Sequence, residues 1–184
     1  MATKISFVSL GCDKNLIDSE IMLGLIDEKG YIITPNDSEA DVIIINSCGF
    51  ILDANQEAID KVLEMADYKA NGNCKALIVT GCMAQRYQDE IQQEIPEVDA
   101  VIGTTGYTEI VPILDEILAE AEASQKEAAV EEPKEKSFVN CCPSIDLLPA
   151  SLADKRVVTT GGYTAYLKIA EGCNKRCTYC IIPY

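Results

Sequence analysis

The chain has 184 residues, of which 48% are hydrophobic, so it can build one packed domain with a remainder and is not globally disordered. It carries 30 acidic and 15 basic residues, and the net charge of -15 disfavours binding of nucleic acid unless the basic residues cluster. The chain contains 0 His, which excludes Ser-His-Asp and Cys-His catalysis and leaves thiolates and carboxylates as candidate metal ligands.

Short β-branched apolar runs alternate with amphipathic segments over residues 4–119. Continuous apolar runs of this kind are typical of strands that are buried on both faces of a parallel sheet. The expected strands are Ile5–Leu10, Tyr31–Thr34, Val42–Asn46, Ala76–Thr80 and Val98–Ile102. The alternation predicts an α/β fold with a doubly wound, flavodoxin-like and mostly parallel sheet.

Two long helices are expected, one before and one after the third strand in the sequence. The first would be capped by Asn15 and run to about Glu28, with Gly30 just beyond its end. The second would be capped by Asp53 and stopped at residues 71–72. Its predicted buried face consists of Ile59, Val62, Leu63 and Ala66.

Two further helices follow the fourth and fifth strands. One is expected from about residue 83 to residue 94, and the other begins near Thr108 with Pro112 in its first turn. Residues 35–41 are too few for a crossover helix between parallel strands. We therefore expect a single helical turn at Ser38–Ala40 or a very short second strand.

The composition divides the chain into three parts: an N-terminal α/β domain over 1–120, an acidic linker over 121–160, and the start of a second domain over 161–184. Glutamates and Pro133 mark the linker, whereas Tyr163–Ala170 alternates as a strand should. The charge from residue 155 onward is +4, five basic residues less one acidic, which leaves -19 for residues 1–154. We expect the second domain to be truncated, because its first strand has no sheet of its own.

Three cysteines stand at equivalent positions after strands: Cys12, Cys48 and Cys82. The carboxyl ends of parallel strands meet at one edge of a sheet, so neighbouring strands would bring these side chains together. A single cysteine of this kind is more often an ordinary buried residue. Three at matched positions favour an iron–sulfur cluster with one iron left open, since a zinc site would normally need a fourth ligand.

A second set of three cysteines lies within eight residues, Cys173, Cys177 and Cys180. A loop with this spacing can hold three corners of a cubane cluster. The last two alone would also fit half of a zinc site, but Cys173 and the aromatic Tyr179 make the iron–sulfur interpretation more specific. The chain opens with neither a signal peptide nor a membrane span, so we expect a reducing, cytoplasmic location in which 9 Cys point to metal or redox chemistry.

These motifs together resemble the methylthiotransferase family of radical S-adenosylmethionine enzymes. The matching segments are Leu10-Gly11-Cys12, Asn46-Ser47-Cys48-Gly49-Phe50, Thr80-Gly81-Cys82-Met83-Ala84-Gln85-Arg86-Tyr87, and residues 167–173 leading into the second cysteine set. The resemblance implies two 4Fe-4S clusters, an auxiliary one on the first set and one on the second set that binds S-adenosylmethionine and yields a 5′-deoxyadenosyl radical. It also implies that the backbone of Tyr179 contacts the adenine, and that residues 161–184 are the first strand and cluster loop of a radical-enzyme barrel.

The segment from Gly11 to Glu20 is similar to the branch of this family that modifies the β-carbon of an aspartate in a small-subunit ribosomal protein. The implied partners are that basic protein and an electron donor such as flavodoxin or ferredoxin, with no membrane. The tRNA adenosine methylthiotransferases are the alternative within the family, and a non-catalytic metal-binding or docking module is the alternative outside it. The resemblance gives no role to Cys74, Cys141 or Cys142, and it implies that the chain is inactive without the rest of the barrel and the β-barrel TRAM domain.

Overall fold

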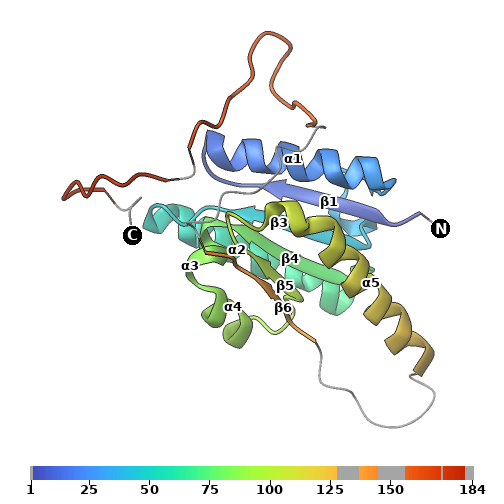
Figure 1. The fold of residues 1–184 in the computed structure, drawn as a ribbon. Coiled ribbons are helices and arrows are strands. Elements are labelled where there is room, and N and C mark those ends of the chain that lie inside the picture. Colours follow the sequence, from blue (N-terminus) through green and yellow to red (C-terminus); the bar gives the residue numbers. More distant parts are fainter. Residues whose placement is uncertain (1, 128–136, 145–155, 171, 181–184) are drawn as a thin grey trace.

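The computed structural model describes residues 2–127, 137–144, 156–170 and 172–180. Its centre is a parallel sheet in the order β2-β1-β3-β4-β5-β6 (Figure 1). The strands are β1 (Lys4–Ser9), β2 (Ile32–Ile33), β3 (Val42–Ser47), β4 (Ala76–Gly81), β5 (Ala100–Ile102) and β6 (Val139–Cys141). The first five follow the flavodoxin-like strand order, which confirms the predicted fold class.

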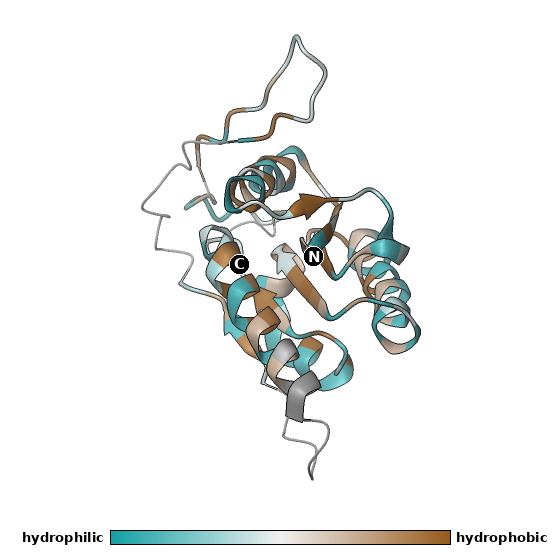
Figure 2. Ribbon diagram, turned by 90° about the vertical axis from the view of Figure 1, so that its right-hand side faces the viewer, coloured by the Kyte–Doolittle hydropathy of each residue, from teal (hydrophilic) through white to brown (hydrophobic). Residues whose placement is uncertain are grey.

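Helices cover both faces of the sheet, as a doubly wound fold requires. They are α1 (Asp13–Lys29), α2 (Leu52–Asn71), α3 (Cys82–Arg86), α4 (Gln88–Glu94) and α5 (Ile110–Glu127), with 3-10 turns η1 (Asp37–Glu39) and η2 (Tyr107–Glu109). The most hydrophobic segments are the strands between these helices, whereas hydrophilic residues lie along the outer sides of the helices (Figure 2).

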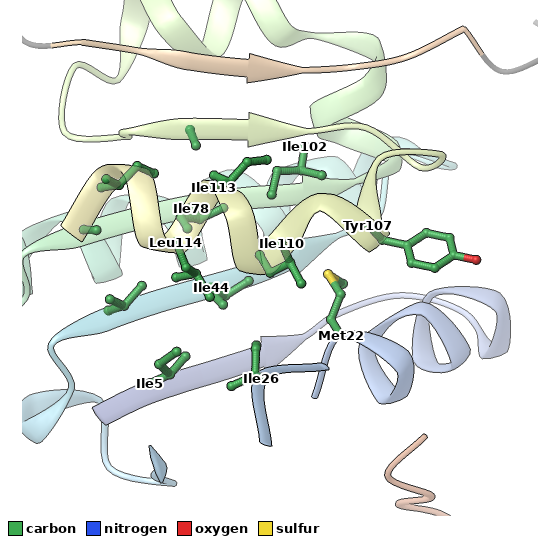
Figure 3. Packing of buried hydrophobic residues seen from close by; sticks show 14 of the residues in the cluster. Ile5, Met22, Ile26, Ile44, Ile78, Ile102, Tyr107, Ile110, Ile113 and Leu114 are labelled. Carbon is green, nitrogen blue, oxygen red and sulfur yellow. The ribbon is translucent and has the colours of Figure 1, made fainter. Parts of the chain in front are cut away.

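Alternate residues of each central strand supply the two cores. On one face Ile44 and Ile78 pack against α1 and α5, and Figure 3 shows Ile110 and Leu114 of α5 lying over them. On the other face Ile43 and the neighbouring strand residues pack against α2, α3 and α4. Because side chains alternate across a strand, the continuous apolar runs in the sequence serve both faces at once.

The helix boundaries differ from the sequence-based expectation at three points, one of which is the N-cap of α2, Ile51 rather than Asp53. The N-cap of α1 is Cys12 rather than Asn15, whose side chain bonds backbone carbonyls within the sheet edge instead. The helix expected over 83–94 is split in two, because the backbone of Tyr87 leaves the helical region with φ -123 and ψ 33. Gly30 ends α1 in the left-handed conformation with φ 92, as its position predicted.

The buried face of α2 is rotated from the predicted one. Ala58, Val62, Met65 and Ala66 are buried. Ile59 and Leu63 are 38% and 51% exposed, so the prediction was wrong for these two residues. The short connection before β3 contains both expected features, a 3-10 turn and a two-residue strand, and β2 is an exposed edge strand rather than a strand buried on both faces.

The region after α5 departs furthest from expectation. Residues 139–141 show no periodicity in the sequence, yet they form β6, which pairs in parallel with β5. Conversely, the expected strand Tyr163–Ala170 forms no strand, because no other described strand pairs with it. The barrel portion of the predicted fold is therefore not seen in the described residues, and the expectation for residues 128–136, 145–155, 171 and 181–184 lies outside them.

Candidate metal centre

Cys12, Cys48 and Cys82 follow the carboxyl ends of three adjacent parallel strands, β1, β3 and β4. The last paired residues of these strands are Ser9 with Asn46 and residue 47 with residue 81, so the three cysteines leave the same edge of the sheet. From β1 the chain continues to β2 on one side, whereas from β3 it continues to β4 on the other side. The strand order therefore reverses between β1 and β3, and this edge is the topological switch point. Open α/β sheets bind their ligands at such a point.

The side chain of Asn15 joins the ends of these strands. It is 4% exposed, and its Nδ2 donates to the carbonyl oxygen of Ser47 at 2.8 Å and of Leu10 at 3.3 Å. Its Oδ1 lies 3.7 Å from the Sγ of Cys12 and 3.6 Å from the Sγ of Cys82, so it accepts from both thiols. One buried amide thus fixes the ends of β1 and β3 and contacts two of the three cysteines. Sequence reasoning assigned it to a helix cap, and only its place between two apolar segments could have indicated burial.

Two glycines let the backbone turn close to the thiols. Gly11 has φ 101, and a Cβ there would lie 2.8 Å from the Cβ of Cys48. Gly81 has φ 95, and a Cβ there would lie 2.4 Å from the Oδ1 of Asn46 and 2.4 Å from the carbonyl oxygen of Ser47. Positive φ and absent space both require glycine at these positions. The backbone therefore approaches the thiols closely at both positions.

The loop after Cys48 contacts the start of α3. A Cβ on Gly49 would lie 3.0 Å from the backbone nitrogen of Met83, so the two segments touch. Burial raises the pKa of the Cys82 thiol, and the nearby Cys48 and Cys12 raise it further, against a hydrogen bond from the Gly49 backbone that lowers it. The net direction of the pKa of the Cys82 thiol is upward. Cys48 is buried, Cys82 is partly buried and Cys12 is exposed. Neighbouring thiols become thiolates most readily when a cationic centre compensates their charge.

The switch point offers three thiols as donors. In the described part of the chain, no three Cys, Asp or Glu side chains lie close enough together to ligate one metal ion. An iron–sulfur cluster takes each thiolate on a separate iron, so its ligands stand farther apart than those of one zinc ion. The three thiols at the switch point have the donor chemistry of such a cluster, and two of them contact one amide.

The second cysteine set lies in an open loop, residues 172–180, termed here the Cys173 loop. Cys173 and Cys177 are exposed and Cys180 is intermediate. The backbone N–H of Lys175 donates to the Sγ of Cys173 at 3.4 Å, and Tyr179 is 90% exposed. Three accessible thiols in one loop can wrap a cluster without displacing a packed core.

A cleft of about 310 Å³ lies between the first turn of α1 and the segment that leads to the Cys173 loop. Asp13, Lys14 and Ile17 line it on the α1 side, and residues 166–170 together with Gly172 and Cys173 line the other side. The loop lies on the side toward which the strands of the sheet point (Figure 1). The structure thus places the Cys173 loop beside the helix that Cys12 caps.

The three remaining cysteines are held within the fold. Cys74 is buried, its Sγ donates to the carbonyl oxygen of Ala76 at 3.1 Å, and burial raises its pKa to about 11. Cys141 ends β6, and burial raises the pKa of Cys142 to about 11 as well. Cys141 and Cys142 fall within the expected linker 121–160, but Cys141 pairs with β5 at the sheet edge and Cys142 follows it directly. None of the helices in the described residues has the length and apolar character that a membrane span requires.

The sequence of the chain matches one protein family and several curated proteins. Residues 4–103, more than half of the chain, match the family described as "Uncharacterized protein family UPF0004". The chain is 52% identical over 180 residues to the ribosomal protein uS12 methylthiotransferase RimO of Lachnoclostridium phytofermentans, which covers 98% of the chain and 37% of that relative. It is 49% identical over 185 residues to RimO of Acetivibrio thermocellus, covering 100% of the chain and 38% of the relative, and 47% identical over 182 residues to RimO of Clostridioides difficile, covering 98% and 37%. The chain therefore spans well under half the length of the curated relatives it matches.

Proposed function

This chain belongs to the UPF0004 family, in its RimO methylthiotransferase branch, and from that premise we propose that its whole protein adds a methylthio group to the β-carbon of an aspartate in ribosomal protein uS12. In this proposal Cys12, Cys48 and Cys82 hold an auxiliary 4Fe-4S cluster, and the Cys173 loop holds a second 4Fe-4S cluster that binds S-adenosylmethionine. The protein acts in the cytoplasm and takes electrons from a carrier such as flavodoxin or ferredoxin.

The observation that carries the proposal is the convergence of three thiols at the topological switch point. Asn15 contacts two of them, and Gly11 and Gly49 bring the third, Cys48, against the same group. Gly11 has φ 101, and a Cβ there would lie 2.8 Å from the Cβ of Cys48, so the chain needs glycine beside this thiol. Close backbone approach of this kind is typical of places where a chain surrounds a ligand.

The residues of this chain would hold one cluster at the switch point and the other in the Cys173 loop, and Cys173 lines a cleft with the first turn of α1. When bound, the clusters supply the reductive cleavage of S-adenosylmethionine and the sulfur that is transferred, since an unactivated C–H bond has no useful acidity for base catalysis. Tyr179 follows two of the loop cysteines and is exposed, so its backbone is available to the adenine of S-adenosylmethionine.

The charge of the N-terminal part supports a basic protein as substrate rather than tRNA. Residues 1–154 carry a charge of -19, the total of -15 less the +4 of the remainder. A groove along α2 begins at Leu10, near Cys12, and is lined by four acidic side chains, by Gln56 and by Lys61, which pairs with Glu64. Its acidic residues are Asp53, Glu57, Asp60 and Glu64. A surface of this sign attracts a basic ribosomal protein and repels a phosphate backbone.

Metal analysis tests the cluster assignment. After anaerobic reconstitution with iron and sulfide, we expect the chain to bind both, and Cys12→Ala or Cys173→Ala to remove about half of the iron each. Cys74→Ser is the matched control and should retain all of it. Tight binding of zinc without iron or sulfide would show a zinc-binding module and would contradict the proposal.

Mass spectrometry of cells that lack the gene tests the substrate. We expect the methylthio mass on uS12 to disappear while methylthioadenosine in tRNA remains. Reintroduction of the whole protein should restore the mass, and reintroduction of its Cys12→Ala variant should not. Loss of the tRNA modification with uS12 unchanged would assign the protein to the tRNA branch instead.

A further inference from the structure

We propose that the buried carboxylates of α1, Glu20 and Asp18, are positioning residues that dock the segment 156–170 and thereby hold the Cys173 loop beside the auxiliary cysteine set. Residues 156–170 are termed here the docking segment. The docking itself depends only on this structure, whereas its consequence for the two clusters rests on the proposed function.

Glu20 lies in the middle of α1 and is 0% exposed. Its Oε2 accepts from the Nε of Arg156 at 2.7 Å and lies 2.5 Å from Nη2 of the same guanidinium. Its Oε1 accepts from the backbone N–H of Thr159 at 2.6 Å and from the Thr159 hydroxyl at 2.8 Å. Its backbone carbonyl accepts from the N–H of Val157 at 3.1 Å. Both carboxylate oxygens are thus occupied by a segment 136 to 139 residues away.

A buried carboxylate is tolerated only when its charge is compensated and its lone pairs are satisfied. For the Glu20 carboxylate, the docking segment supplies both the cation and the donors. Docking therefore explains why an acidic side chain is buried at this position of α1.

A second ion pair lies farther along the docking segment. The Nζ of Lys168 is 2.7 Å from Oδ1 of Asp18, and the two side chains are 10% and 11% exposed. The same ammonium lies 5.2 Å from the ring centroid of Tyr107, in the turn before α5. The guanidinium of Arg156 also donates to the carbonyl oxygen of Tyr166 at 2.8 Å, which ties the two ends of the segment together.

Apolar packing does not determine where the docking segment lies. Tyr163, Leu167 and Ile169 are 102%, 81% and 89% exposed. The polar contacts with α1 are therefore what orients the segment. They also account for the charge asymmetry of the sequence, because Arg156 and Lys168, two basic residues of the C-terminal part, pair with acidic residues of the N-terminal part.

The docking geometry links the two cysteine sets through one rigid helix. Cys12 caps the N-terminus of α1, and Asp18 and Glu20 lie about two turns farther along. Lys168 is five residues before Cys173, so the ion pair with Asp18 limits how far the Cys173 loop can move from the first turn of α1. The cleft lined by Asp13 and Cys173 is the result.

Amide hydrogen exchange tests the docking in the chain without any cluster. Glu20→Gln removes the charge with little change of shape, and Thr159→Val removes a donor from the segment without touching α1. We expect exchange of the Val157 and Thr159 amides to become at least about tenfold faster in Glu20→Gln, as expected when a charge-assisted bond is lost. Amides of β3 should keep their exchange rates, which shows that the domain remains folded.

The matched control is Asp27→Asn, an exposed carboxylate near the end of the same helix, which should leave exchange of the docking segment unchanged. If Glu20→Gln unfolds the domain, Thr159→Val still provides the test, with faster exchange confined to residues 156–160. Docking is refuted if these amides exchange in the unmodified chain as fast as in an unstructured peptide, or if neither substitution accelerates them.

Electron paramagnetic resonance tests the consequence for the clusters. In the reconstituted and reduced chain we expect a magnetic interaction between the two clusters, and we expect Glu20→Gln to weaken it without loss of iron. An unchanged interaction in Glu20→Gln would refute the positioning role. A reconstituted chain without iron would refute the proposed function and leave the exchange result standing.

Discussion

A methyl group at residue 81 should disrupt the sheet edge far more than the same group at residue 30. Both residues are glycines with nearly equal positive φ, 95 and 92. Nothing lies within 4 Å of a Cβ on Gly30, whereas a Cβ on Gly81 would lie 2.4 Å from both the Oδ1 of Asn46 and the carbonyl oxygen of Ser47. Comparison of Gly81→Ala with Gly30→Ala therefore separates the free-energy cost of a positive φ from the cost of the contact between the new Cβ and the neighbouring strand.

The expected magnitudes follow from those two costs. Alanine in the left-handed conformation of Gly30 costs roughly 1–2 kcal/mol. Gly81 has ψ -157 and occupies a region that is nearly restricted to glycine, which costs about 1–3 kcal/mol. Overpacking against a strand backbone adds about 1–3 kcal/mol more. We expect Gly81→Ala to lower the free energy of unfolding by about 4 kcal/mol and Gly30→Ala by about 1.5 kcal/mol.

Urea unfolding followed by circular dichroism measures the difference. With a slope of about 2 kcal/mol per molar urea, the midpoint of Gly81→Ala should fall about 1 M or more below that of Gly30→Ala. Because Gly81 precedes Cys82, Gly81→Ala should also reduce the iron bound after reconstitution, and Gly30→Ala should not. Equal midpoints for the two variants would refute the reasoning from close backbone approach.

Three further results are expected. Asn15→Ala leaves buried carbonyl groups without a donor and should cost about 2–3 kcal/mol in urea unfolding, against less than about 0.5 kcal/mol for the exposed Asn71→Ala; a small effect of Asn15→Ala would show that the amide does not join the strands. Burial and the hydrogen bond to Asp115 raise the pKa of Tyr31 from 10.0 to about 12, so above pH 10 the unfolded state binds fewer protons and stability should fall until about pH 12. Tyr31→Phe should flatten that decline, and an unchanged thermal-unfolding profile against pH would contradict it. Replacement of Cys74, Cys141 and Cys142 by serine should leave the iron content of the reconstituted chain unchanged. Loss of iron would show that one of these three residues is a ligand.

The strand pattern and the auxiliary cysteine positions could be predicted because each depends on local sequence. Runs such as Val42–Asn46 are buried on both faces, and this leaves a continuous apolar signature. The position of Cys12, Cys48 and Cys82 after such runs then determines that they meet at one edge. No long-range information is needed for either step.

What could not be predicted depends on contacts between distant residues. β6 is three residues long and is a strand only because β5 lies beside it. The partners of Glu20, Arg156 and Thr159, lie 136 and 139 residues farther along the chain. A Glu within a helix is normally expected to be exposed to solvent, so the sequence gives no sign of its burial. Asn15 likewise has an ordinary capping pattern, and only the fold shows that its amide faces the sheet.

The pairing of β6 also defines how much of the chain must be present for the N-terminal domain to remain soluble. Residues 100–102 of β5 are fully buried, and β6 covers their outer edge through the register Ala100–Val139 to Ile102–Cys141. The sequence match to the family ends at residue 103, so a domain excised at that boundary would expose an apolar edge strand. Exposed edges of this kind recruit strands from other molecules and lead to aggregation. An excised domain that retains residues 137–144 keeps this edge protected.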